Sequence, residues 1–271
     1  MKVLYFNAKA GSNYNGTYRV PDFILNTIAN KSPDIVILTE VIPIFREGDS
    51  YKFLKDNYTI HYSLYKQKEK NAVLIAVNKN YKIIDISYEV PGFSDDDKSP
   101  DYLNIHVNTN GTIYNIIGFR MITDEYNYDE ERRLFDIFCK NTELNMENEV
   151  TLLIGDFNNA KHYGRLSQSF DDVEDLYWTQ NWDRIKKRYY GERKKRLQYN
   201  YNLHIIKDLL SDKGLTLIEN EADYSFVDRF GNQIHDDHFF ISKLMSEKVS
   251  ISFFDSDASL DHRYFEAIIE D

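Results

Sequence analysis

The sequence predicts one domain over residues 1–271, of the α/β (α+β) class, with two sheets packed face to face and helices outside. The chain is 42% hydrophobic and 15% aromatic, so it holds ample apolar material for a single layered core. Many short apolar stretches are separated by turn residues, whereas few stretches carry apolar residues at helical spacing. This proportion is typical of paired sheets covered by a small number of helices.

The N-terminal part predicts a strand, a helix and a second strand. Residues 3–7 form a short apolar run, and residues 18–29 carry apolar side chains at helical spacing. The Ser32-Pro33 pair should stop this helix. Residues 34–40 then form an apolar run that ends in an acid, which predicts a buried strand with a polar end.

The rest of the chain predicts further strands and two amphipathic helices. The helices are expected over residues 129–140 and 202–213, and the second meets Gly214, a residue that favours the conformation of a C-cap. A polar loop over residues 94–100 is expected to be a solvated connection between strands. Strands are expected over residues 72–77, 82–88, 102–107, 113–119, 150–154, 238–242 and 264–269.

Composition and charge exclude several classes of protein. The formal net charge of -11 argues against a protein that coats nucleic acid through an overall positive field. The single cysteine, Cys139, cannot form an internal disulfide, and the sequence has no Cys/His array for structural zinc. The N-terminus lacks the features of a secretory signal, and no stretch approaches the roughly 20 apolar residues that span a bilayer. We therefore expect a cytoplasmic protein.

Polar residues that adjoin apolar strands form the candidate site. Phosphate ester cleavage needs a cation to neutralise charge, a base that takes a proton from water, and donors to the non-bridging oxygens. Carboxylates and amides at strand ends supply these groups, and carboxylates that hold Mg²⁺ would also account for the acidic total. Five parts of the sequence have this composition: Asn7; Glu40; Gly155-Asp156-Phe157-Asn158; His235-Asp236-Asp237-His238; and Asp261-His262.

The Gly-Asp-Phe-Asn run has the most definite expected geometry. We expect its strand to break at Gly155 and to present Asp156 and Asn158 on one side, because residues two apart share a face in extended chain. Taken alone, each part has an ordinary interpretation, such as a turn residue for Asn7 and a helix N-cap for Glu40. Their joint occurrence in this order favours a site.

In this order the five parts resemble the motifs of the endonuclease/exonuclease/phosphatase superfamily, which includes exonuclease III-type and pancreatic deoxyribonuclease-type enzymes. The resemblance spans nearly the whole chain, and its Gly-Asp-Phe-Asn and terminal Asp-His elements are the most specific. It implies a four-layer α/β sandwich of two mainly antiparallel sheets, with the site at one edge. It also implies hydrolysis of phosphodiester bonds with Mg²⁺ or Mn²⁺ as the cofactor.

The resemblance assigns roles to the first motif residues. Glu40 is similar to the principal metal ligand of the family, assisted by Asn7 and, through water, by Asp261. Asp156 is similar to the residue that orients or deprotonates the attacking water, and Asn158 is similar to the phosphate-binding amide.

The remaining motifs contain two matches and two departures. His262 is similar to the residue that contacts the scissile phosphate, and Asp237 to the acid that orients the site, with Asp236 left open as an adjacent competitor. The sequence departs from the family at Arg120, where a His or Tyr is usual, and at Leu260, where Ser is common. A guanidinium can still donate a fork of hydrogen bonds to phosphate, so we expect Arg120 among the catalytic residues.

Residues 178–201 concentrate basic and aromatic side chains in an otherwise acidic chain. Basic groups neutralise phosphates and exposed rings stack on unpaired bases, so this segment favours DNA or RNA as the partner. The alternative that stays open is an amphipathic surface helix whose basic residues pair with local acids. The candidate substrate-binding residues are Arg184, Lys187, Arg188, Tyr189 and Tyr190.

The sequence thus predicts a metal-dependent phosphodiesterase, and we favour a nuclease that uses in-line attack of water. Two alternatives stay open. An enzyme for a small nucleotide or a phosphorylated headgroup agrees better with the acidic charge. A non-catalytic binding module on the same scaffold is the other alternative, and it should bind Mg²⁺ poorly.

Overall fold

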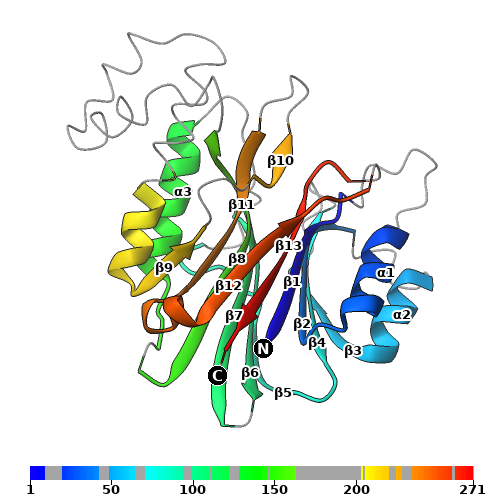
Figure 1. The fold of residues 1–271 in the computed structure, drawn as a ribbon. Helices are drawn as coiled ribbons and strands as arrows, with labels where there is room; N and C mark the ends of the chain where they lie inside the picture. Colours follow the sequence, from blue (N-terminus) through cyan, green and yellow to red (C-terminus); the bar gives the residue numbers. More distant parts are fainter. Residues whose placement is uncertain are drawn as a thin grey trace.

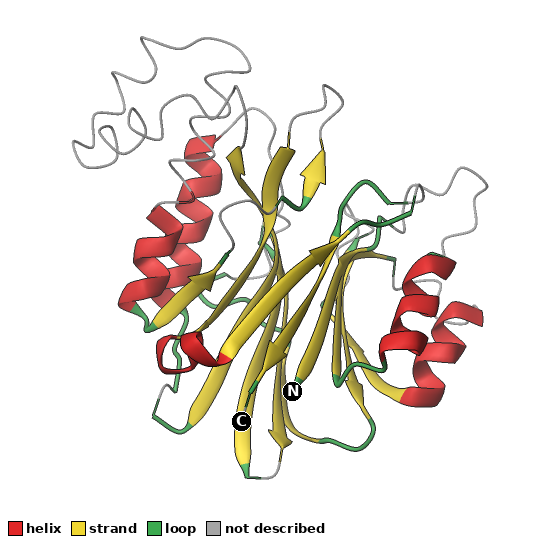
Figure 2. Ribbon diagram, in the orientation of Figure 1, coloured by secondary structure: helices red, strands yellow, loops and turns green. Residues whose placement is uncertain are grey.

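Two sheets lie back to back, with helices on both outer faces (Figures 1 and 2). This arrangement confirms the predicted four-layer α/β sandwich. None of the helices that the structure describes is long and apolar enough to cross a membrane. The computed structural model describes residues 1–9, 20–42, 49–64, 71–93, 99–109, 111–121, 128–145, 147–162, 203, 205–219, 224–227, 233–257 and 260–270.

The first sheet has six strands among the described residues. Strands β1 and β2 run parallel, and the other neighbouring strands of this sheet run antiparallel. Both chain termini lie near one end of the molecule, beside this sheet (Figure 1). The strand order is β12 (Val249–Phe254), β13 (Tyr264–Ile269), β1 (Lys2–Asn7), β2 (Ile35–Val41), β4 (Ala72–Asn78) and β3 (Tyr58–Tyr62).

The second sheet has seven strands among the described residues. Strands β7 and β8 run parallel, and the other neighbours run antiparallel, so both sheets are mainly antiparallel as expected. The order is β10 (Phe226–Val227), β11 (Gln233–Ser242), β8 (Glu149–His162), β7 (Thr112–Arg120), β6 (Asp101–Thr109) and β5 (Lys82–Ser87), with β9 (Leu215–Ile218) also paired to β11.

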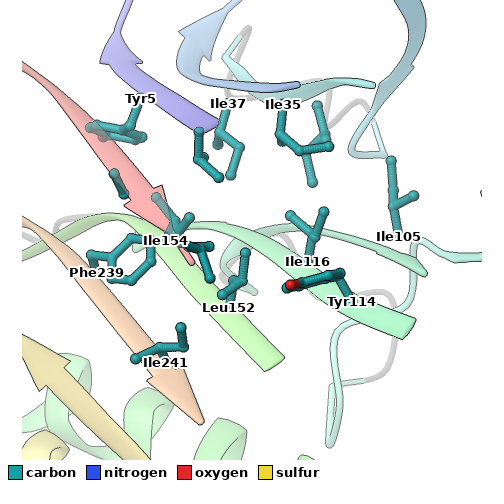
Figure 3. Close-up of a cluster of buried hydrophobic side chains, with 14 of the residues drawn as sticks. Tyr5, Ile35, Ile37, Ile105, Tyr114, Ile116, Leu152, Ile154, Phe239 and Ile241 are labelled. Carbon is teal, nitrogen blue, oxygen red and sulfur yellow. The ribbon is translucent and has the colours of Figure 1, made fainter. Parts of the chain in front are cut away.

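The space between the sheets is filled by the inward-facing residues of both (Figure 3). Along β1, Val3 and Tyr5 point into this space, whereas Leu4 and Phe6 point to the opposite face, because side chains alternate along a strand. From the second sheet, the inward-facing residues include Ile116, Leu152, Ile154, Phe239 and Ile241.

Each outer face is covered by a helical layer. Helices α1 (Asp22–Lys31) and α2 (Asp49–Asn57) pack against the first sheet. Helix α3 (Tyr128–Asn141) and a helix over residues 205–212 pack against the second. A short 3-10 helix, η2 (Lys243–Lys248), connects β11 to β12.

The predicted elements are present, with differences at their ends. The helix expected over residues 18–29 begins only at Asp22, because Pro21 occupies the position before it with an extended ψ of 141°. It continues to Lys31, and Ser32 ends it in the left-handed conformation with φ 42°. The stop at Ser32-Pro33 therefore lies where the sequence indicates it.

Two expectations about strand ends were wrong. The strand expected to break at Gly155 continues as β8 to His162. A Cβ at Gly155 would overlap the carbonyl oxygen of Phe119 on β7, so this glycine permits close approach of two parallel strands. The strand expected to begin at His238 begins at Gln233, which places Asp237 inside β11.

Several further elements are present that were not predicted from the sequence. These are α2, β3, β9, β10 and β12. Of the helix expected over residues 202–213, the structure describes residues 203 and 205–213, and Gly214 follows with φ 85°, as a C-cap requires. The loop expected over residues 94–100 lies outside the described residues apart from Ser99 and Pro100.

Candidate active site

The candidate site is the polar end of the face between the two sheets. On β1, Asn7 continues the inward-facing series of Val3 and Tyr5, and on β8, Asp156 continues the series of Leu152 and Ile154. The strands thus carry apolar side chains along most of their length and polar ones at one end. Asn7 and Asp156 are almost completely buried there, with 2% of each residue exposed.

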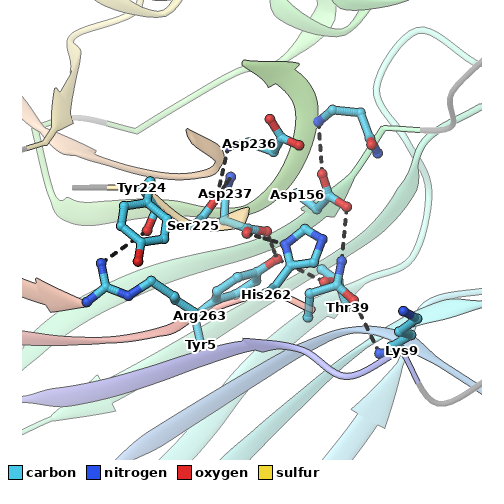
Figure 4. A network of polar contacts seen from close by, with 12 residues as sticks. Tyr5, Lys9, Thr39, Asp156, Tyr224, Ser225, Asp236, Asp237, His262 and Arg263 are labelled. Atoms are coloured by element: carbon cyan, nitrogen blue, oxygen red, sulfur yellow. Dashed lines mark hydrogen bonds and ion pairs between the residues drawn. The ribbon is translucent and has the colours of Figure 1, made fainter. Parts of the chain in front are cut away.

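One line of contacts crosses the site from sheet to sheet. The Tyr5 hydroxyl donates to Oδ1 of Asp237 at 2.5 Å and lies 2.9 Å from the Thr39 hydroxyl. The other carboxylate oxygen, Oδ2, lies 2.7 Å from Nδ1 of His262 (Figure 4). The His262 ring in turn packs on the Phe226 ring, with the centroids 4.8 Å apart. The contact settles that Asp237, and not Asp236, holds this imidazole.

Asp156 is surrounded by amide donors. Nδ2 of Asn7 donates to its Oδ2 at 3.2 Å, and the backbone N–H of Asn158 donates to its Oδ1 at 2.9 Å. The second contact is an Asx-type turn, and it bends the chain so that Asn158 has φ 50°. Asp156 and Asn158 therefore do not share a face as expected, because the Asn158 amide turns aside and donates to the Met121 carbonyl at 2.7 Å.

The electrostatics of the two acids differ although both are buried. Burial, followed by the negative charge of Asp237, raises the pKa of Asp156 well above its usual range. Burial also acts to raise the pKa of Asp237, but the positive charge and hydrogen bond of His262 outweigh it and lower that pKa. Of the two, Asp156 is thus the carboxyl group that holds a proton more readily.

His262 is held in its charged form. Burial acts to lower the pKa of His262, but the carboxylate of Asp237 in contact with it, and then Asp156 and Asp236, raise the pKa to about 10. Burial and the charge of Asp237 raise the pKa of Asp236 to about 7, although His262 acts against them. The site therefore combines a fixed positive charge with two carboxyl groups of raised pKa.

Glu40 and Arg120 meet across the two sheets. On β2, two residues lie between Leu38 and Val41 where only one lies between their partners on β4, and Glu40 in this bulge has a φ of 56°. In a regular strand Glu40 would share the outer face of Leu38. The bulge instead lets its Oε1 reach within 3.3 Å of a terminal nitrogen, Nη2, of Arg120 at the end of β7.

The described residues contain no group of three or more His, Cys, Asp or Glu side chains that could hold a metal ion by itself. Of the expected metal ligands, Glu40 contacts Arg120, and Asp261 forms an ion pair with Lys9 at the surface. The backbone N–H of Lys9 also donates to Oδ1 of Asn7 at 3.2 Å, so this lysine connects two of the expected ligands.

The structure brings together the residues that the motifs single out, apart from one segment. Asn7, Asp156 and Asn158 form one contact group, Asp237 and His262 a second, and Glu40 and Arg120 a third. The charges of the first two groups and of Glu40 act on one another. The expected substrate-binding residues lie outside the described residues: Arg184, Lys187, Arg188, Tyr189 and Tyr190.

Sequence reasoning missed several members of the site. Tyr5 could have been predicted, because it shares the inward face of β1 with Asn7 and carries a hydroxyl group within an apolar run of that strand. Ser225, whose hydroxyl accepts from the backbone N–H groups of Asp236 and Asp237 at 2.9 and 3.1 Å, had no such signal. Asp101 and Lys9 had no signal in the sequence either, since charged residues beside loops are common.

Comparisons with known proteins agree on the fold. No family model and no curated protein sequence matches the chain. Among solved structures, the 3′-5′ exonuclease NExo from Neisseria meningitidis is 18% identical, with 100% of both chains covered and a TM-score of 0.67. An AP endonuclease from Archaeoglobus fulgidus is 16% identical, with 100% of this chain and 99% of that chain covered and a TM-score of 0.61.

A third solved structure, D. rerio TDP2 complexed with a single-strand DNA product, is 12% identical, with 98% of this chain and 97% of that chain covered and a TM-score of 0.65. These proteins share one architecture with the chain along nearly its whole length. The chain therefore has the fold of the endonuclease/exonuclease/phosphatase superfamily.

Proposed function

We propose that the chain, as a single domain over residues 1–271, is a divalent-metal-dependent phosphodiesterase and that it acts as a nuclease. One observation carries the proposal: Asp156 and the His262–Asp237 pair lie together at the polar end of the face between the sheets. A carboxyl group of raised pKa beside a fixed cation is suited to activate water next to a phosphate.

In the proposed reaction, Asp156 accepts the proton of the attacking water. Its raised pKa suits this role, because a carboxylate with a higher pKa takes a proton from water more readily than one with an ordinary pKa. Asn7 holds one carboxylate oxygen and the Asn158 N–H holds the other, so the carboxylate cannot rotate freely. The fixed orientation supports in-line attack, in which the water oxygen bonds to phosphorus while the bond to the leaving ester oxygen breaks and that oxygen takes a proton from solvent.

Positive charge for the phosphate comes from His262 and Arg120. His262 is kept protonated by Asp237 and is the proposed contact to the scissile phosphate, with Asp237 acting through it. Arg120 presents a planar fork of donors near Asp156, its neighbour in the register of β7 and β8. Asn158 is proposed to donate to the phosphate through the second hydrogen of its side-chain amide, since the first donates to the Met121 carbonyl and its backbone N–H donates to Asp156.

The residues present fit a hard divalent cation of the Mg²⁺ or Mn²⁺ type. Glu40 and Asn7 offer the oxygen donors that such ions prefer, and Asp261 offers one through water. Mg²⁺ is usually held by one or two carboxylates plus water and substrate phosphate, so a cluster of three acids is not required. When bound, the cation would neutralise charge on the phosphate.

We propose a nucleic acid as the substrate. Similar structures include an exonuclease, an AP endonuclease and a protein complexed with single-strand DNA, which supports a polynucleotide. The basic and aromatic segment over residues 178–201 supports the same choice, with Arg184, Lys187, Arg188, Tyr189 and Tyr190 as the proposed contacts. The net charge of -11 instead favours a small phosphodiester.

The test is cleavage of labelled single-stranded DNA, duplex DNA, RNA and a small phosphodiester, with and without Mg²⁺ or Mn²⁺. Asp156→Asn should lower turnover about 100-fold or more. Asp136→Asn is the matched control, because the Asp136 side chain is 40% exposed on α3. A rate that falls steeply with salt supports the polymer. Equal rates in the wild type and Asp156→Asn would contradict the proposal.

A further inference from the structure

Arg120 is held by two acids in different environments. Its Nη1 donates to Oδ2 of Asp101 at 3.1 Å, and its Nη2 donates to Oε1 of Glu40 at 3.3 Å. Asp101 lies opposite Arg120 in the register of β6 and β7, and its side chain is 0% exposed, whereas that of Glu40 is 25% exposed. The guanidinium thus joins one deeply buried acid to one acid that faces solvent.

The two contacts differ in strength for a physical reason. An ion pair without solvent is weakly screened, so separating Arg120 from the buried Asp101 costs more than separating it from an acid that water can reach. Water can replace the longer contact to Glu40, because that carboxylate is partly exposed. When a competitor approaches, the Glu40 contact is therefore the one that opens, and Asp101 retains the guanidinium.

Two positively charged groups can bind the same carboxylate oxygen of Glu40: the Arg120 guanidinium and the proposed divalent cation. It is the proposed principal metal ligand, and its Oε1 already accepts from Arg120. A guanidinium and a hard divalent cation cannot both take the same lone pair at full strength, and their positive charges repel each other. Arg120 also lies opposite Asp156 in the strand register, so a donor released from Glu40 remains beside the proposed phosphate position.

We propose that Arg120 competes with the divalent cation for Glu40, and that Asp101 is the positioning residue that keeps the displaced guanidinium in the site. The released donor then serves a phosphate oxygen. This inference rests on the proposed function and adds a coupling between the metal and phosphate sites. The opposite role, in which Arg120 merely aligns Glu40 for the cation, predicts the opposite effect on affinity.

Calorimetric titration with Mn²⁺ in the absence of substrate separates these roles. Arg120→Gln should bind Mn²⁺ about fivefold more tightly than the wild type or better. Because this variant removes the ion pair between Arg120 and Asp101, the Asp101→Asn/Arg120→Gln double variant tests the same point with a neutral side chain at position 101. Arg133→Gln is the matched control, since Arg133 is exposed and belongs to α3, which packs on the outer face of the second sheet. Glu40→Gln should lose the Mn²⁺ affinity.

Inorganic phosphate, titrated into the Mn²⁺-saturated protein, tests Asp101. Asp101→Asn should weaken phosphate binding while Mn²⁺ affinity is unchanged or higher, whereas a purely structural role would weaken both. Weaker or unchanged Mn²⁺ binding by both Arg120 variants, or no Mn²⁺ binding by any protein, would overturn the inference. Catalysis by the wild type in that case leaves the proposed function standing. Tighter Mn²⁺ binding by the Arg120 variants, together with no hydrolysis by the wild type, would instead reject the proposed function and support the competition for Glu40.

Discussion

Nδ1 of His262 and Oδ2 of Asp237 lie 2.7 Å apart and join the two sheets at the site. Asp237 belongs to β11 of the second sheet, and His262 lies two residues before the start of β13 of the first. The contact is buried, with the side chain of Asp237 0% and that of His262 12% exposed. It therefore fixes the charge of the imidazole and also the distance between the sheets.

We expect Asp237 and His262 to act as a unit, so that replacing either residue removes most of the activity. If His262 contacts the phosphate as proposed, Asp237→Asn and His262→Gln should each lower kcat/KM about 100-fold or more, because one removes the acid that keeps the imidazole charged and the other removes the imidazole. The double variant should be little worse than either single variant, since residues that act together are not additive. Steady-state kinetics of the four proteins measures this. Losses that multiply in the double variant would show that the two residues act independently.

The Tyr5 hydroxyl should contribute to both stability and activity, whereas an ordinary buried hydroxyl contributes to stability alone. Tyr5→Phe removes the donor to Oδ1 of Asp237 and should lower the free energy of unfolding by about 1–3 kcal/mol. Tyr58→Phe is the matched control, because its hydroxyl donates to the neutral carbonyl of Pro33 at 3.1 Å. Urea denaturation and the cleavage assay compare the two. Only Tyr5→Phe should reduce activity, and equal activities would contradict the role of the hydroxyl.

Much of the site was predictable because alternation along a strand is visible in the sequence. The contacts of Asn7 and Asp156 follow from their places in inward-facing series of apolar residues. The choice between Asp236 and Asp237 did not follow, since Phe239, Phe240 and Ile241 are all apolar and hide the alternation. A bulge between His235 and Asp237 alters the spacing further.

Other features depend on contacts between distant segments. The bulge at Glu40 gives a non-glycine residue a positive φ, which no local pattern of residues indicates. Strand β12 could have been predicted from the sequence, because Val249, Ile251 and Phe253 alternate with less apolar residues. Helix α2 was harder to find, since within Asp49–Asn57 its buried hydrophobic residues are only Tyr51 and Leu54.

Gly155 provides a test of how closely β7 and β8 approach. Gly155→Ala should lower the free energy of unfolding by about 1–3 kcal/mol or more, because the new Cβ overlaps the Phe119 carbonyl and the backbones must separate. Gly111→Ala is the control, since nothing lies within 4 Å of a Cβ there and only its φ of 98° opposes the change. Urea denaturation measures both. A smaller loss for Gly155→Ala than for Gly111→Ala would contradict the steric argument.

His235 should make the fold sensitive to acid. Burial, followed by the charge of His238, lowers the pKa of His235 from 6.5 to about 3. Between these pH values the unfolded chain binds a proton that the folded chain does not, so stability falls as the pH is lowered from 6.5 towards 3. At pH 5 this single group should cost about 2 kcal/mol relative to pH 7.

His235→Phe should remove that part of the acid sensitivity. The phenyl ring preserves the stacking on His238, whose ring centroid is 5.0 Å away, and the edge contact with Phe253 at 5.1 Å. Asp236, with its pKa raised to about 7, titrates with the opposite sign in both proteins: its contribution is full below pH 3.8 and is lost as the pH rises through 7. The difference between the two proteins therefore isolates His235. Urea denaturation at pH 7 and pH 5 should show a loss about 2 kcal/mol smaller in the variant, and equal losses would mean that His235 is protonated in the folded protein.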